Sequence, residues 1–214
     1  MRQLSGLLLF VLSLTGCQQA YYATMEKFGV EKREILVNRV KEARDAQLEG
    51  QQQFKDALDE LSQLLQFHGG DLQQKYEVLD SEYKQSIKAA ELVSSRIDKV
   101  ESVAEALFSE WRDELEQYQN ASLKAQSKQK LVSTEKQFRQ LLSKMRSAEN
   151  KMQPVLKVMQ DNVLFLKHNL NAKAIGSIQT DFATLQQDVR NLISEMNKAI
   201  ADSNKFIAQM QSGS

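Results

Sequence analysis

The chain has 214 residues, of which 28 are basic and 28 acidic. This balance leaves no basic excess of the kind that binds nucleic acid or anionic lipid, so neither is expected as a partner. A single cysteine excludes an intrachain disulfide. One proline and an abundance of Lys, Glu, Gln, Ala and Leu are typical of long helices.

Residues 1–16 have the pattern of a secretory signal peptide. Arg2 precedes the short apolar run 7–12, which is followed by Leu14, Thr15, Gly16 and Cys17. This last motif resembles a bacterial lipobox, in which the chain is cut before the cysteine and the cysteine is acylated. The resemblance predicts palmitate-type chains on Cys17, and two or three such chains, at about 0.8 kcal/mol per buried methylene, hold a protein permanently on a membrane. The alternative is a free structural thiol.

Gln18 and Gln19 follow the cysteine, where an aspartate would signal retention at the inner membrane in enterobacterial-type lipoproteins. By this resemblance the expected location is the periplasmic face of the outer membrane, in preference to the inner membrane. Residues 17–25 then form the lipidated anchor and linker, and residues 26–211 form the folded domain.

From Leu36 to Leu64 apolar residues recur three and four apart, with Gln47 and Gly50 as two weak positions. This heptad pattern predicts a helix over about 26–67. His68-Gly69-Gly70-Asp71 then combines residues suited to a C-cap with one suited to an N-cap, which predicts a break.

A second heptad run, from Leu72 to Tyr118, predicts a helix over 72–119, followed by a turn at 120–128. A third run predicts a helix over 128–169, and its phase continues through Pro154, which favours a kink over a break. Asn171 is placed to cap the last helix, predicted over 172–211.

Four such helices with short turns predict an all-α fold, an elongated antiparallel four-helix bundle roughly 60–70 Å long. Folding the first hairpin places Gly50 near Ala90 and Gln47 near Val93, which predicts a thin waist. If Cys17 holds the start of the first helix at a membrane, the turns at His68 and His168 share the far end, and the 120–128 turn returns to the membrane end.

Motifs of catalysis are absent from the sequence: there is no glycine-rich phosphate loop, no Cys-x-x-Cys and no His-Glu-x-x-His. The chain is therefore expected to be no enzyme and to bind no nucleotide, cofactor or metal. The candidate contacts at the far tip are His68, His168, Asn169 and Asn171. For the two histidines the favoured role is to interact with the negative ends of their helices, and the alternative is contact with a metal or a partner.

Two segments carry a family resemblance: residues 21–37 (YYATMEKFGVEKREILV) and residues 163–175 (VLFLKHNLNAKAI). They resemble an uncharacterised proteobacterial family, domain-of-unknown-function family 2959. The resemblance extends over essentially the whole mature chain and implies a helical envelope lipoprotein, with no catalytic residue to carry over.

Together these patterns predict a structural or interaction protein of the cell envelope, a tether or scaffold that contacts membrane lipid through acylated Cys17 and binds a protein partner or itself. The alternative is a self-assembling coiled-coil protein that remodels membranes or serves in envelope stress.

Overall fold

The computed structural model describes residues 31–66 and 72–212. These residues form four helices and no strand: α3 (Lys32–Leu65), α4 (Leu72–Leu115), α5 (Ala121–His168) and α6 (Ala172–Ser212). The helices contain 34, 44, 48 and 41 residues, so at 1.5 Å per residue the three longer ones reach roughly 60–70 Å. The all-α prediction is confirmed, although α3 is shorter than its partners.

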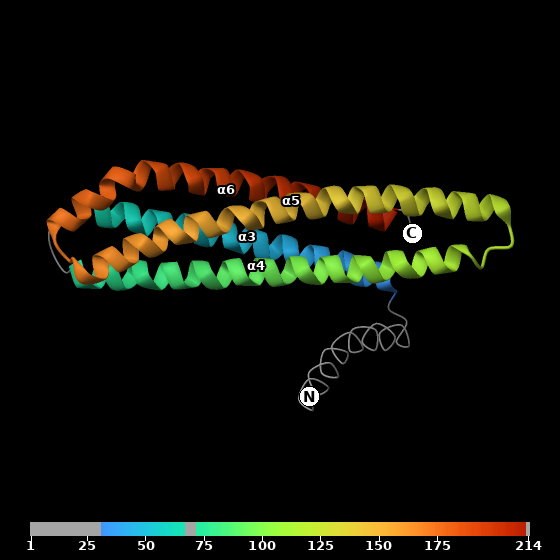
Figure 1. Ribbon diagram of the computed structural model, residues 1–214, viewed down its shortest axis with the longest axis horizontal. Helices are drawn as coiled ribbons and strands as arrows, with labels where there is room; N and C mark the ends of the chain where they lie inside the picture. The colour runs from blue at the N-terminus through green and yellow to red at the C-terminus, as the bar shows by residue number, and fades with distance from the viewer. Residues whose placement is uncertain (1–30, 67–71, 213–214) are drawn as a thin grey trace, which may run out of the picture.

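The helices run up and down the long axis of a slender rod (Figure 1). Helix α3 packs against α4 and α6, and α5 packs against the same two helices. At one end the α4–α5 hairpin extends past the start of α3 and the end of α6 (Figure 1). Lys32 Nζ lies 2.9 Å from Glu110 Oε1, which marks the level at which α3 begins beside α4. Beyond that level the rod has two helices instead of four.

The core follows the predicted heptad seams along the whole rod. Its fully buried large side chains come from all four helices: Leu36, Phe54, Leu61, Leu64, Ile97, Leu141, Met145, Met152, Leu166, Leu185, Leu192 and Met196. Near the two-helix end Phe138 contacts Phe108 edge to face and Phe206 in a tilted arrangement, with ring centroids 5.6 and 6.1 Å apart. Because each such side chain stabilises the fold by about 1.5–3 kcal/mol when buried, this continuous seam holds the helices together.

The turn predicted at 120–128 is wrong in its position. Helix α4 ends at Leu115 and α5 begins at Ala121, so the connection is residues 116–120. The cause is Asn120, whose side-chain oxygen accepts hydrogen bonds from the backbone N–H groups of Ser122 (2.9 Å) and Leu123 (3.1 Å). With that cap in place, the polar stretch up to Lys130 continues the helix because its Lys, Ala and Gln residues favour helix.

The other boundaries agree more closely with the sequence. Helix α3 ends at Leu65 and α4 begins at Leu72, so the break is confirmed, while residues 67–71 themselves lie outside the described part of the chain. The predicted start of the first helix, at residue 26, also lies outside it. Pro154 stays inside one continuous helix, as its unbroken phase predicted. The Asn171 side-chain oxygen accepts a bond from the N–H of Ala174 at 3.1 Å and so caps α6.

Gly50 is closely packed, but its neighbours differ from the predicted ones. A Cβ atom added at Gly50 would lie 3.3 Å from Met196 Cε and 3.5 Å from Val93 Cγ2, and Ala90 is not within contact distance. Counting residues along the α3–α4 hairpin predicted Ala90 as the neighbour of Gly50, one helical turn away from its true neighbour, Val93. Such a count gives no information about contacts with α6. Gly50 thus lies against side chains of both neighbouring helices, Val93 of α4 and Met196 of α6.

Two glutamines near Gly50 are buried in the core, and they differ in whether their side-chain amides have hydrogen-bond partners. Gln51 Nε2 donates to Asn197 Oδ1 (2.9 Å) and to the carbonyl oxygen of Ile193 (3.4 Å). Gln47 is fully buried, and neither its Oε1 nor its Nε2 has a hydrogen-bond partner among the described residues. An unpaired buried amide destabilises a fold by about 1–3 kcal/mol, so the bundle is weakest at this layer.

Candidate functional site

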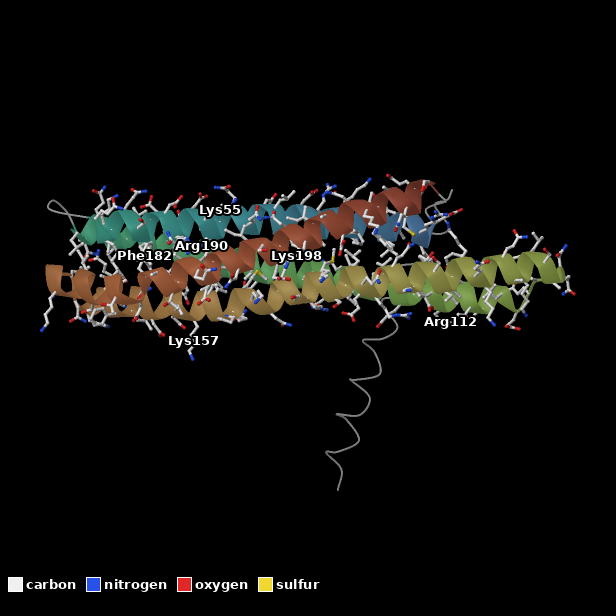
Figure 2. All side chains as sticks on the ribbon, turned by 90° about the horizontal axis from the view of Figure 1, so that it is seen from above. Lys55, Arg112, Lys157, Phe182, Arg190 and Lys198 are labelled. Carbon is white, nitrogen blue, oxygen red and sulfur yellow. The ribbon has the colours of Figure 1, made fainter. Side chains whose placement is uncertain are left out.

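A long groove lies between α4 and α5, which pack against each other in the rod of Figure 1. Its volume is about 1510 Å³, and it is lined from Tyr83 to Ser102 on α4 and from Arg146 to Gln160 on α5. Figure 2 shows Lys157, one of the lining residues, projecting from α5 on the side opposite Lys55 of α3. We refer to this surface as the α4–α5 groove.

Small side chains open the α4–α5 groove on its α4 wall. Ser94, Ser95 and Ser102 stand where larger side chains would close the space between the helices. The floor is apolar and includes Ala90 and Met152, which are 3% and 1% exposed. The surface therefore combines an apolar floor with hydroxyl, amide and charged groups along its edges.

Arg146 joins the two walls at one end of the groove. Its guanidinium donates to Asp98 Oδ1 (2.7 Å) and Glu101 Oε2 (2.5 Å) on α4 and to Glu149 Oε2 (2.9 Å) on its own helix. Partial burial disfavours its charge, but the hydrogen bonds that it donates to the three carboxylates outweigh this and hold the pKa of Arg146 above its ordinary value. At this end Lys99 and Arg146 line the groove together with Asp98 and Glu149, so charges of both signs meet there.

Pro154 lies on the α5 wall near the middle of the groove. Proline has no N–H, so the carbonyl oxygen of Asn150, one turn earlier, receives no helical hydrogen bond from that position. Asn150 and Gln153 also line the groove. Their two side-chain amides can pair with donors and acceptors of another polypeptide.

The groove lacks the arrangement of a nucleophile and its base. The Ser94 hydroxyl donates to Glu149, a carboxylate that Arg146 already binds. No histidine or cysteine is among the residues that line the groove. Burial, with Asp161 and Asp80 nearby, raises the pKa of Tyr83, so its hydroxyl stays protonated and can donate. The chemistry available is hydrogen bonding, ion pairing and apolar contact.

The residues predicted at the far tip have mainly structural roles where they are described. His168 is the exposed last residue of α5. Asn169 caps that helix, its N–H donating to the carbonyl oxygen of Leu166 (3.1 Å) and its Nδ2 to that of Phe165 (3.0 Å). Asn171 caps α6. His68, and the predicted lipidation motif Leu14, Thr15, Gly16 and Cys17, lie outside the described residues.

Sequence reasoning missed the α4–α5 groove. The heptad pattern reports which residues face the core and says little about the flanks of two neighbouring helices. Two signals pointed to it: the serines of α4, which are small and polar at flanking positions, and Pro154, which removes a hydrogen bond from the opposite wall.

Within residues 31–66 and 72–212 no cluster of three or more His, Cys, Asp or Glu side chains could hold a metal ion. No helix in that part of the chain is long and apolar enough to cross a membrane. A family model described as "Protein of unknown function (DUF2959)" matches residues 21–210. No curated protein and no solved structure matches the chain.

Proposed function

The chain belongs to the family of proteins of unknown function DUF2959, and we propose that it is a lipid-anchored scaffold of the cell envelope that binds a protein partner along the α4–α5 groove. The anchor is acylated Cys17, and the location is the periplasmic face of the outer membrane. The lipobox-like motif Leu14-Thr15-Gly16-Cys17 and the apolar run before it support this part of the proposal.

The observation that carries the scaffold role is the groove itself. It follows roughly twenty residues of α4 and fifteen of α5, or about 20–30 Å of a rod that a continuous core keeps straight. An amphipathic helix or extended segment fits such a groove, placing apolar side chains on the floor and polar groups against the edges.

Photo-crosslinking in living cells tests this proposal. A photoreactive amino acid replaces Gln153 or Ser95, both exposed in the groove, and in a matched control it replaces Gln52, which is exposed on α3. We expect one discrete heterologous band from each groove position and none from position 52.

The same experiment separates the alternatives. A ladder of self-crosslinks from the groove would instead indicate assembly of copies of this chain and would lead to measurements of membrane shape. Equal yields from the groove and from position 52 would contradict a groove-specific partner.

A further inference from the structure

The rod ends in a step at which four helices become two. Helix α3 begins at Lys32 and α6 ends at Ser212, while the α4–α5 hairpin extends past both of these ends (Figure 1). Thr134 of α5 and Met210 of α6 line one pocket, so they lie at about the same level. Because α5 begins thirteen residues before Thr134, about 20 Å of this helix lie beyond the step. We refer to residues 111–133 of the hairpin as the overhang.

The pocket at this step has an apolar floor. Its volume is about 400 Å³, and all four helices line it. Leu107 and Trp111 of α4, which are half-buried, form the floor together with the buried side chain of Met210. Charged side chains of both signs complete the lining: Glu31, Lys32, Arg33, Glu110, Glu114 and Lys130.

Leu123 extends the uncovered apolar surface along the overhang. It lies eleven residues before Thr134, which is three turns of α5, and so it is on the same side of that helix. Leu123 is 51% exposed, whereas Phe138, one turn after Thr134 and beside α6, is 5% exposed. The overhang therefore lacks a helix over the side that the rest of the rod buries.

The chain itself has a segment that starts at this pocket. Glu31, the first described residue, is part of the lining, so the residues before it lead away from the step. The family match begins at residue 21, which places residues 21–30 in the same domain as the four helices. Ten residues of helix span about 15 Å, which is enough to cover most of the overhang.

Residues 21–30 have the spacing of a helix with one apolar side. Tyr21, Met25 and Phe28 are four and three residues apart. Ile35 follows Phe28 by seven residues and is 4% exposed in the core, so the spacing continues a buried side of α3. Because α3 and α4 pack antiparallel, a helix that continues α3 backwards runs along the end of α4 (Figure 1).

We propose that residues 21–30 form a helix that packs on the overhang, with Phe28 in the pocket against Trp111. If Cys17 is acylated, as in the proposed function on which this consequence rests, only residues 17–20 then separate the packed helix from the membrane. Four residues reach at most about 14 Å when extended, against about 50 Å for the fourteen residues from Cys17 onward. The packed segment therefore keeps the rod close to its membrane and limits the height of the α4–α5 groove above it.

Fluorescence quenching tests the packing without the anchor. Trp111 is the only tryptophan in the chain, so its emission reports on the pocket directly. The chain beginning at Gln18 retains every described residue and lacks Cys17. In this chain acrylamide quenching measures how far the Trp111 ring is open to solvent.

Two double variants show which side of the segment covers the ring. M25S/F28S should raise the quenching constant of Trp111 about twofold and shift its emission to longer wavelengths, because the indole loses an apolar cover. The matched control E26S/K27S alters the other side of the same segment and should leave both unchanged. Circular dichroism verifies that each variant keeps its helices.

Disulfide formation then locates the segment, since the chain beginning at Gln18 contains no cysteine of its own. Lys32 pairs with Glu110, and one turn farther along both helices this register places residue 28 beside Glu114. A disulfide needs Cα atoms within about 7 Å, so neighbouring positions form one fastest. F28C/E114C should therefore oxidise several-fold faster than the matched control F28C/D113C, in which the second cysteine is on the adjacent exposed residue.

Unchanged quenching in M25S/F28S, or equal rates for the two cysteine pairs, would overturn the packing of residues 21–30. Quenching raised equally by E26S/K27S would also contradict it. None of these changes alters the α4–α5 groove, so their failure leaves the scaffold proposal standing. An absence of groove crosslinks in cells would likewise leave the packed segment standing.

Discussion

Gln47→Met should stabilise the protein. The Gln47 side chain is fully buried and has no hydrogen-bond partner among the described residues, next to the close approach at Gly50. Methionine has a similar length and volume and no amide to desolvate, so the change removes a cost of about 1–3 kcal/mol. For a chain of this size, 1 kcal/mol corresponds to about 2–4 °C, so Tm should rise by about 2–12 °C.

Thermal unfolding followed by circular dichroism measures the effect, with Gln51→Met as the matched control. Gln51 lies one turn along the same helix, and its Nε2 donates to Asn197 Oδ1 and to the carbonyl oxygen of Ile193. Its replacement should lower stability by about 1 kcal/mol because it leaves two acceptors without their donor. If Gln47→Met lowered Tm as Gln51→Met does, the Gln47 amide would have a partner and the reasoning would be refuted.

Three further changes test other parts of the rod. Gly50→Leu should destabilise by about 1–3 kcal/mol in urea unfolding, because the new side chain would collide with Met196; an unchanged midpoint would exclude a close approach. Asn120→Ala should cost about 0.5–2 kcal/mol and speed amide exchange in the first turn of α5, whereas unchanged exchange would mean that the cap is not needed. The pKa of Glu195 is lowered mainly by the hydrogen bond that it accepts from Lys198. The charged carboxylate therefore stabilises the fold at pH values above its unfolded pKa, which is near 4.3. This stabilisation is lost as the pH falls through the lower pKa of the folded state. Lys198→Met should therefore reduce stability slightly at pH 7 and not at pH 2, and an equal loss at both pH values would contradict the linkage.

The fold followed from heptad spacing because each seam of this bundle is long and nearly unbroken. Positions such as Leu36, Phe54 and Leu192 are buried where the period predicted them. Boundaries depended on single caps: Asn171 was recognisable from its place before a new run, whereas Asn120 stands among polar residues that suit a turn and a helix equally well. Only the structure shows which of those residues its side chain caps.

The candidate site was harder to foresee because its surface lies between two helices. Ser94 and Gln153 line the same groove only because α4 and α5 run antiparallel in one particular register. The network around Arg146 depends on the same register, since two of its three carboxylates belong to the other helix. By contrast, a heptad count does predict that Leu164 and Phe165 are exposed, because each lies one or two residues away from a core position of the seam.

The intact mass of the mature protein extracted from cell membranes tests the lipid anchor most directly, and both proposals build on that anchor. The account predicts a chain that begins at Cys17, heavier than the polypeptide by a diacylglycerol group and one further acyl chain. It also predicts that Cys17→Ser leaves the protein unacylated and outside the membrane fraction. A mass matching the unmodified polypeptide, with or without residues 1–16, would contradict the account.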